Sequence, residues 1–124
     1  MLNVTHAILA TMIAQKAGSI VSIAVGRGLR GGCDASIYSA AKAAIIVFSQ
    51  SVALEVGRHC VRINTIAPGD AEARWKPQSK EVRSPLGRNT DAIDVGKAVN
   101  FLFSDEACHI TGTCLDLSGG TNLH

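Results

Sequence analysis

Apolar residues follow two different rhythms in the first part of the chain, and each rhythm predicts an element of secondary structure. Over residues 3–15 they recur at spacings of three and four, which predicts a helix with one broad buried face. Residues 19–25 form a short apolar run without charge, typical of a strand that is covered on both faces of a parallel sheet. The glycine-rich segment 26–35 is expected to be a loop.

The middle of the chain predicts a long helix and a second strand. Ser36 is expected to cap the helix, and Gly57 is its expected stop signal. Residues 60–67 alternate between apolar and polar side chains as a strand does, and the pair Pro68 and Gly69 closes that strand.

The last part of the chain begins with a polar, proline-containing segment. It predicts a long loop or lid over about residues 70–89. Asp91 is expected to cap a helix that runs to about residue 103, with Asp94 at the third helical position, and residues 113–117 are expected to form a short strand. The order of helices and strands predicts an α/β fold with about three parallel strands and crossover helices, in a single domain over residues 1–124.

Composition narrows the function classes. The chain has 124 residues, is 47% hydrophobic and carries a net charge of +2, too small and too scattered for a nucleic-acid surface. Its longest apolar stretch, residues 7–14, is far shorter than the ~20 residues of a membrane-spanning helix, and the N-terminus lacks the basic start of a signal peptide. We therefore expect a cytoplasmic protein with no membrane or nucleic-acid partner.

The cysteines and histidines predict no metal site. The four cysteines include no C-x-x-C pair, and the four histidines form no H-E-x-x-H motif. Cys108, His109 and Cys114 are close in sequence, but a zinc site would need a fourth ligand from a distant segment. Reduced thiols are the simpler expectation.

Gly26, Gly28 and Gly31 have the G-x-G-x-x-G spacing of a dinucleotide-binding turn. Such a turn needs its third glycine in the first turn of a helix, where free N–H groups hold the pyrophosphate. Here residues 32–35 separate Gly31 from the next helix, and no acidic residue follows about twenty positions later. We therefore predict a loop beside an active site rather than a phosphate-binding turn.

Tyr38 and Lys42 lie four residues apart, which places a phenol and an ammonium on one face of the predicted helix. An ammonium about 5 Å from a phenol oxygen favours the phenolate by about 3 kcal/mol at an effective dielectric of about 20. Taken alone, Tyr and Lys at this spacing on an exposed helical face are usually solvated side chains, so the surrounding segments decide the interpretation.

This pair and its surroundings resemble the short-chain dehydrogenase/reductase family, over nearly the whole chain but only the second half of the family's pattern. The segments that carry the resemblance are N-V-T at 3–5, the glycine-containing strand and loop at 18–28, Y-S-A-A-K at 38–42, R-I-N-T-I-A-P-G at 62–69, P-L-G-R at 85–88, F-L-F-S-D-E-A at 101–107, I-T-G-T at 110–113 and G-G at 119–120.

The resemblance implies an oxidoreductase that uses NAD or NADP to interconvert a small-molecule carbonyl and alcohol. It implies that Tyr38 transfers the proton, that Lys42 also holds the nicotinamide ribose, and that Asn3 anchors a water in the proton relay. Three further positions are implied to line the nicotinamide: Pro68, Gly69 and the backbone near Ala71.

Three positions depart from the family's pattern. The catalytic serine of the family falls at Val25, the cofactor-contacting threonine at Ala73, and the acid before the last glycines at Ser118. An isopropyl group donates no hydrogen bond to a carbonyl, and the loss of one such donor costs on the order of 3 kcal/mol in a transition state.

The family's glycine-rich pyrophosphate turn and its first strands would lie before Asn3, so we expect the C-terminal half of a Rossmann-like doubly wound parallel sheet, without the N-terminal βαβ half. We expect no dehydrogenase turnover from this polypeptide alone. The strand over 19–25 would then have an unpaired edge, and we expect a homo-oligomer that uses the helix at 3–15 and the helix that begins at Ser36.

Two other functions fit the sequence. The first is a non-catalytic remnant of the family that acts as an oligomerisation or interaction module, which the residues at positions 25 and 73 favour. The second is a binding protein for an anionic ligand that uses basic residues of the glycine loop and the lid: Arg27, Arg30, Arg74, Lys76, Lys80 and Arg83.

Overall fold

A three-stranded parallel sheet organises the molecule, in the order β1-β2-β3. The computed structural model describes residues 1–69 and 84–122. The elements in chain order are α1 (Leu2–Gln15), β1 (Gly18–Ile23), α2 (Arg27–Arg30), α3 (Ser36–Val56), the 3-10 turn η1 (Gly57–His59), β2 (Val61–Pro68), α4 (Ala92–Phe103), the 3-10 turn η3 (Asp105–Ala107) and β3 (Cys114–Leu117). The predicted α/β class with parallel strands is confirmed.

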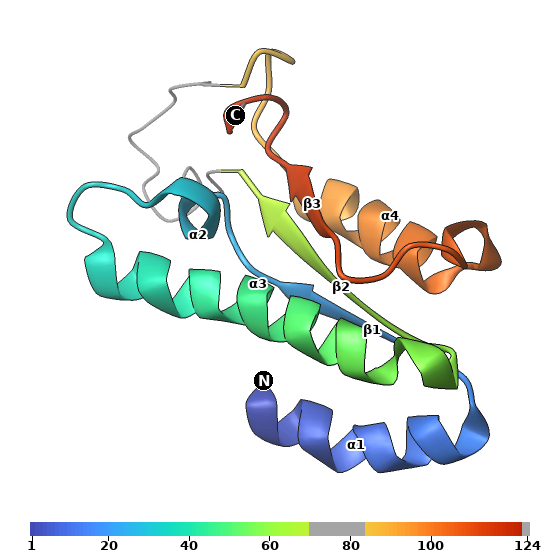
Figure 1. Cartoon of the computed structure of the whole chain (residues 1–124). Helices are drawn as coiled ribbons and strands as arrows, with labels where there is room; N and C mark the ends of the chain where they lie inside the picture. The colour runs from blue at the N-terminus through green and yellow to red at the C-terminus, as the bar shows by residue number, and fades with distance from the viewer. Residues whose placement is uncertain (70–83, 123–124) are drawn as a thin grey trace.

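Helices cover the sheet on both faces (Figure 1). Helices α1 and α3 lie on one face, where a cluster of buried side chains contains Val52, Ala53 and Ile63. Helix α4 covers the other face, where Ile66 and Leu102 belong to a second cluster. Burial of side chains of this size contributes roughly 1.5–3 kcal/mol each, so the two cores hold the helices to the sheet.

Strand β2 is the centre of this arrangement. It pairs with β1 from Val61 to Ile66 and with β3 from Thr65 to Pro68, in parallel register on both sides. Of its eight residues only Arg62 is not fully buried. The alternating pattern therefore predicted this strand correctly, but the strand is covered on both faces.

Strand β1 differs from the prediction in extent and burial. It ends at Ile23 rather than residue 25, and four of its six residues are half-buried. Ile23 is 42% exposed, because β1 is an edge strand and has a neighbour only on its β2 side. The expectation that both faces are fully covered is therefore wrong.

The ends of α3 also differ from the prediction. The cap residue is Ala35, without a side-chain hydrogen bond, and Ser36 is the first helical residue. Gly57 does not end the helical path, because it has right-handed helical angles and η1 follows it. The left-handed residue that turns the chain into β2 is Cys60, with φ 59°.

Helix α4 begins as predicted. Asp91 is its cap, and Asp94 completes a capping box. In this box the Asp91 side chain accepts the backbone N–H of Asp94, and the Asp94 side chain accepts the backbone N–H of Asp91. The predicted loop over 26–35 contains the single helical turn α2. Residues 70–83 of the predicted lid lie outside the described residues.

Among the helices of residues 1–69 and 84–122, one is long and apolar enough, by length and composition alone, to cross a membrane. It comprises Ser36–His59. An 18-residue stretch of it has a mean hydropathy of 1.5, and 28% of that stretch is buried. One stripe of it packs on the sheet through Ile46, Val52 and Val56, as the core helix of an α/β fold does. The exposed side of α3 carries large apolar residues, among them Ile37, Val47 and Leu54.

Candidate functional site

The carboxyl ends of β1 and β2 and the first turns of α3 meet at one edge of the sheet (Figure 1). The N–H of Gly26 donates to the carbonyl of Pro68 over 2.9 Å, which joins the chain after β1 to the end of β2. In open parallel sheets, ligands bind outside the carboxyl ends of the strands. A ligand-binding site is therefore expected at this edge.

Tyr38 and Lys42 lie together at this edge. The Lys42 Nζ is 5.8 Å from the centroid of the Tyr38 ring, within the range of a cation–π contact. Tyr38 is 50% exposed and Lys42 half-buried, so both reach solvent at the start of α3. The spacing of four residues does place the phenol and the ammonium on one helical face.

Gly28 fixes the backbone at Lys42. A Cβ built on Gly28 would lie 2.9 Å from the carbonyl carbon of Lys42, so only glycine lets α2 approach α3 this closely. The contact sets where the lysine begins its reach toward the tyrosine ring. Lys42 has no ion-pair partner within residues 1–69 and 84–122, so its ammonium protons are available to hydroxyl groups.

Water weakens the coupling between the two side chains in this structure. An attraction of about 3 kcal/mol between the ammonium and a phenolate assumes an effective dielectric of about 20, whereas the dielectric of bulk water would reduce this attraction to below about 1 kcal/mol. Because Tyr38 is 50% exposed, the true attraction lies between these limits. A bound molecule that covers the ring would raise it.

The other predicted site residues have different surroundings. Val25 is half-buried directly after β1 and presents only an isopropyl group. Asn3 is exposed on α1 and lines a hollow between α1 and α3 with Phe48 and Glu55, so the structure does not bring it together with Tyr38.

Pro68 and Gly69 are buried at the end of β2. The N–H of Gly69 donates to Leu117 over 3.2 Å, and a Cβ built on Gly69 would lie 2.9 Å from the Ser118 Cα. Glycine is therefore needed at position 69 for the approach of the chain after β3. Ala71 and Ala73 lie outside the described residues.

The glycine loop holds its own amides. Gly26 donates to Pro68, Gly28 to Val25 and Gly31 to Arg27, over 2.8 to 2.9 Å. A pyrophosphate-binding turn needs such N–H groups free. The interpretation of this segment as a loop beside a site, rather than a phosphate turn, agrees with these contacts.

Arg62 and Asn64, in the R-I-N-T-I-A-P-G segment, have a role that sequence reasoning missed. The Arg62 guanidinium donates to the carbonyl of Leu102 over 2.8 Å, and to those of Ser104 and Ile110 over 3.4 Å. Asn64 donates to Ile110 over 2.9 Å and accepts from Thr113 over 3.1 Å. Both side chains fasten the end of α4 and the chain that leads into β3.

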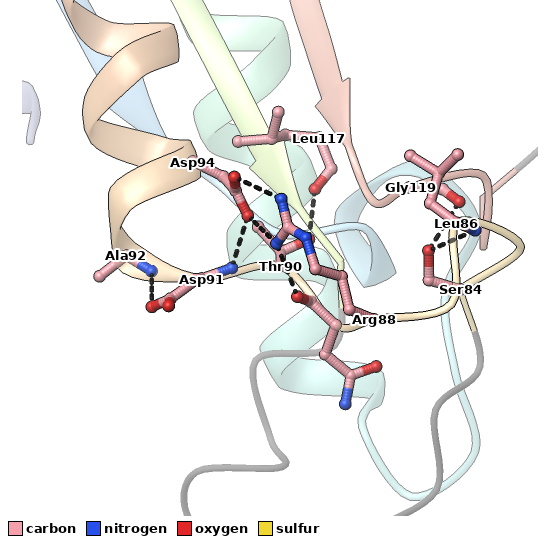
Figure 2. A network of polar contacts seen from close by, with 10 residues as sticks. Ser84, Leu86, Arg88, Thr90, Asp91, Ala92, Asp94, Leu117 and Gly119 are labelled. Atoms are coloured by element: carbon pink, nitrogen blue, oxygen red, sulfur yellow. Dashed lines mark hydrogen bonds and ion pairs between the residues drawn. The ribbon is translucent and has the colours of Figure 1, made fainter.

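A second polar network holds the segment before α4 to the end of β3 (Figure 2). Arg88 forms a two-pronged ion pair with Asp94, and the Thr90 hydroxyl donates to Leu117 over 2.6 Å. The Arg88 guanidinium, and after it the backbone N–H of Asp91, hold the pKa of Asp94 well below its usual range. Sequence alone marked only the capping pair.

Of the basic residues proposed for an anion site, Arg27 and Arg30 lie in the described part of the chain, both in α2. Arg30 donates to the Thr121 carbonyl over 2.6 Å, and Arg27 also has an interaction. The four lid residues, Arg74, Lys76, Lys80 and Arg83, lie outside the described residues. Within residues 1–69 and 84–122, no three histidine, cysteine or acidic side chains are grouped as metal ligands would be.

A protein-family model and known proteins match nearly the whole chain. The family model of the enoyl-(acyl carrier protein) reductases matches residues 1–122. A 3-oxoacyl-(acyl-carrier-protein) reductase of Bos taurus is 39% identical over 122 residues, which are 95% of this chain and 51% of the relative. A reductase of the same name from Haemophilus influenzae is 37% identical over 98% of this chain and 53% of its own.

Solved structures agree with these relatives. An oxidoreductase of the short-chain dehydrogenase/reductase family from Burkholderia thailandensis matches with a TM-score of 0.84 and 35% identity, over 94% of this chain and 50% of that protein. A 3-oxoacyl-(acyl-carrier protein) reductase with bound NAD from Brucella melitensis matches with a TM-score of 0.83 and 28% identity, over 99% of this chain and 48% of that protein. The chain spans about half the length of the curated relatives it matches.

Proposed function

Because the chain belongs to the short-chain dehydrogenase/reductase family, we propose that it carries the proton-transfer side of an NAD- or NADP-dependent oxidoreductase for carbonyl and alcohol substrates. The observation that carries the proposal is the contact of Tyr38 and Lys42, 5.8 Å from ammonium to ring centroid, at the carboxyl edge of the sheet. The 3-oxoacyl-(acyl-carrier-protein) reductases among the relatives make a 3-oxoacyl thioester the first substrate to test.

In this mechanism Tyr38 gives its hydroxyl proton to the substrate carbonyl oxygen during reduction, and recovers it in the reverse direction. The Lys42 ammonium stabilises the phenolate that remains, and donates to the hydroxyls of the nicotinamide ribose. The nicotinamide, when bound, supplies or accepts the hydride. Pro68 and Gly69 would line its ring.

The residues present fit this cofactor at its nicotinamide end. A half-exposed phenol and an ammonium without an ion-pair partner in the described part of the chain are suitable donors for ribose hydroxyls. The amides of Gly26, Gly28 and Gly31 are already bonded within the chain, so these glycines do not offer the pyrophosphate end of the cofactor a free set of N–H groups. We therefore propose that the 124-residue polypeptide alone has no measurable turnover.

The test joins this chain to the first half of a matched reductase and measures NADPH oxidation with a 3-oxoacyl thioester. General acid catalysis contributes roughly 10²–10⁴-fold, so Tyr38→Phe is expected to lower kcat by about that factor. Ser51→Ala, on the exposed side of the same helix, is the matched control and should leave kcat unchanged. Retained turnover in Tyr38→Phe would overturn the assignment of Tyr38.

A second function, an interaction module without catalysis, is favoured by Val25 and by the apolar surface of the α1–α3 layer. Val4, Val47 and Leu54 are 65%, 59% and 88% exposed. We propose that these helices form a homo-oligomer interface under either function. Titration of the joined protein with NADPH separates the two, because the module predicts no saturable quenching or enhancement of cofactor fluorescence.

A further inference from the structure

Within residues 1–69 and 84–122, three buried hydroxyl groups have no hydrogen-bond partner: those of Ser39, Ser49 and Thr65, of which the last two are the most deeply buried. Ser49, on α3, and Thr65, on β2, are each 1% exposed, and neither Ser49 Oγ nor Thr65 Oγ1 has a partner within bonding distance. Buried hydroxyls in folded proteins are almost always hydrogen-bonded, to protein or to ordered water. These two atoms therefore indicate a group that is bound between them.

The packing around them places the two hydroxyls at the same level. Ile63 and Ala53 belong to one buried cluster, and a Cβ built on Gly112, which donates to Ile63, would lie 3.6 Å from the Ala53 Cβ. Helix α3 runs against the direction of β2 (Figure 1). One helical turn from Ala53 back to Ser49 covers about 6 Å, and two strand residues from Ile63 to Thr65 cover about 6.6 Å in the same direction.

By this count Ser49 and Thr65 lie at the same height on α3 and β2, and they do not bond to each other directly. One water molecule that bonds to both joins oxygens that lie between about 4 and 5.5 Å apart. We propose that a single internal water binds between Ser49 Oγ and Thr65 Oγ1. The side wall of this site is Cys114, the register partner of Thr65 on β3.

The water would connect α3 to the central strand seven residues after Lys42 along the helix. It would satisfy two hydroxyls that the surrounding apolar side chains cannot satisfy. A water held by two or more protein groups in this way is part of the fold and is costly to remove.

A crystal structure of the protein at high resolution tests the site directly. The expected result is a water within about 3.2 Å of both hydroxyl oxygens. The overturning result is no density between them, with Ser49 donating instead to the carbonyl of Ile45, the alternative open to a serine inside a helix.

Chemical unfolding of variants gives an independent test. With the water present, Thr65→Val and Ser49→Ala each lower the folding equilibrium constant, by roughly 5- to 30-fold, and the double variant falls much less than the product of the two. Ser51→Ala, whose exposed hydroxyl bonds to Val47, is the control and should change it by less than about 3-fold. Without the water, Thr65→Val removes an unsatisfied hydroxyl and leaves stability equal or higher, which overturns the proposal.

Discussion

Val25 occupies the position that the family resemblance assigns to the catalytic serine. Its side chain stands half-buried after β1 and has no hydrogen to donate to a substrate oxygen. Restoring a hydroxyl with Val25→Ser should therefore raise kcat of the joined enzyme by about 10²–10³-fold, the usual value of one such donor. The measurement is single-turnover NADPH oxidation; Val25→Thr is the control for shape, and an unchanged rate in both would show that position 25 does not face the substrate.

At the scale of single residues, the sequence predicted which side chains share a helical face better than it predicted which distant segments contact one another. The Tyr38 and Lys42 pair follows from helical spacing, because residues four apart share a face. The role of Gly28 does not follow, because its 2.9 Å approach to Lys42 joins segments whose distance only the fold sets. Asn3 lines a hollow between α1 and α3 in this structure, and its part in the proton relay stays a prediction.

At the scale of elements, Arg62 ties the central strand to the end of α4. Its guanidinium donates to the carbonyls of Leu102 and Ser104, at the end of α4, and to that of Ile110, on the chain that leads into β3. Arg62→Ala should lower the free energy of unfolding by about 2–3 kcal/mol, as expected when a charged donor to buried carbonyls is lost. Urea unfolding measures it; Arg58→Ala, exposed beside His59, is the control, and an equal effect of both would contradict the role of Arg62.

The start of α4 predicts a pH dependence. The pKa of Asp94 is lowered by the Arg88 guanidinium, so its folded value lies below its unfolded value of about 3.9. This contribution to stability is present above about pH 4 and is lost as the pH falls below it. Asp94→Asn should flatten the decline of urea midpoints below about pH 4, whereas the exposed Asp105→Asn should not; identical curves for both variants and the parent would contradict the coupling.

The sequence predicted every main helix and strand, because periodicity and capping are local. The ends were less predictable. Gly57 is the expected stop residue, but Cys60 adopts the left-handed backbone angles that turn the chain. Which residue adopts those angles depends on where β2 begins. The half-open state of β1 also escaped the pattern, because the number of neighbouring strands is a property of the whole sheet.

At the scale of the molecule, the apolar outer surface of α1 and α3 predicts self-association. Val47→Glu with Leu54→Glu should weaken a homo-oligomer at least about 10-fold, because two charges would enter an apolar interface. Light scattering against concentration measures this. Ile93→Glu, 65% exposed on α4 at the opposite face, is the matched control. A parent protein that is monomeric at all concentrations would refute the interface.

The burial of β2 also decides how the molecule opens. Both helical layers and both other strands rest on this one strand, whose residues are covered almost throughout. Its amide protons can meet solvent only when the entire structure comes apart, whereas α1 and β1 can detach piecemeal. In deuterated water the amides of residues 61–67 should therefore be the last to exchange, and their exchange rate would report the stability of the chain as a whole.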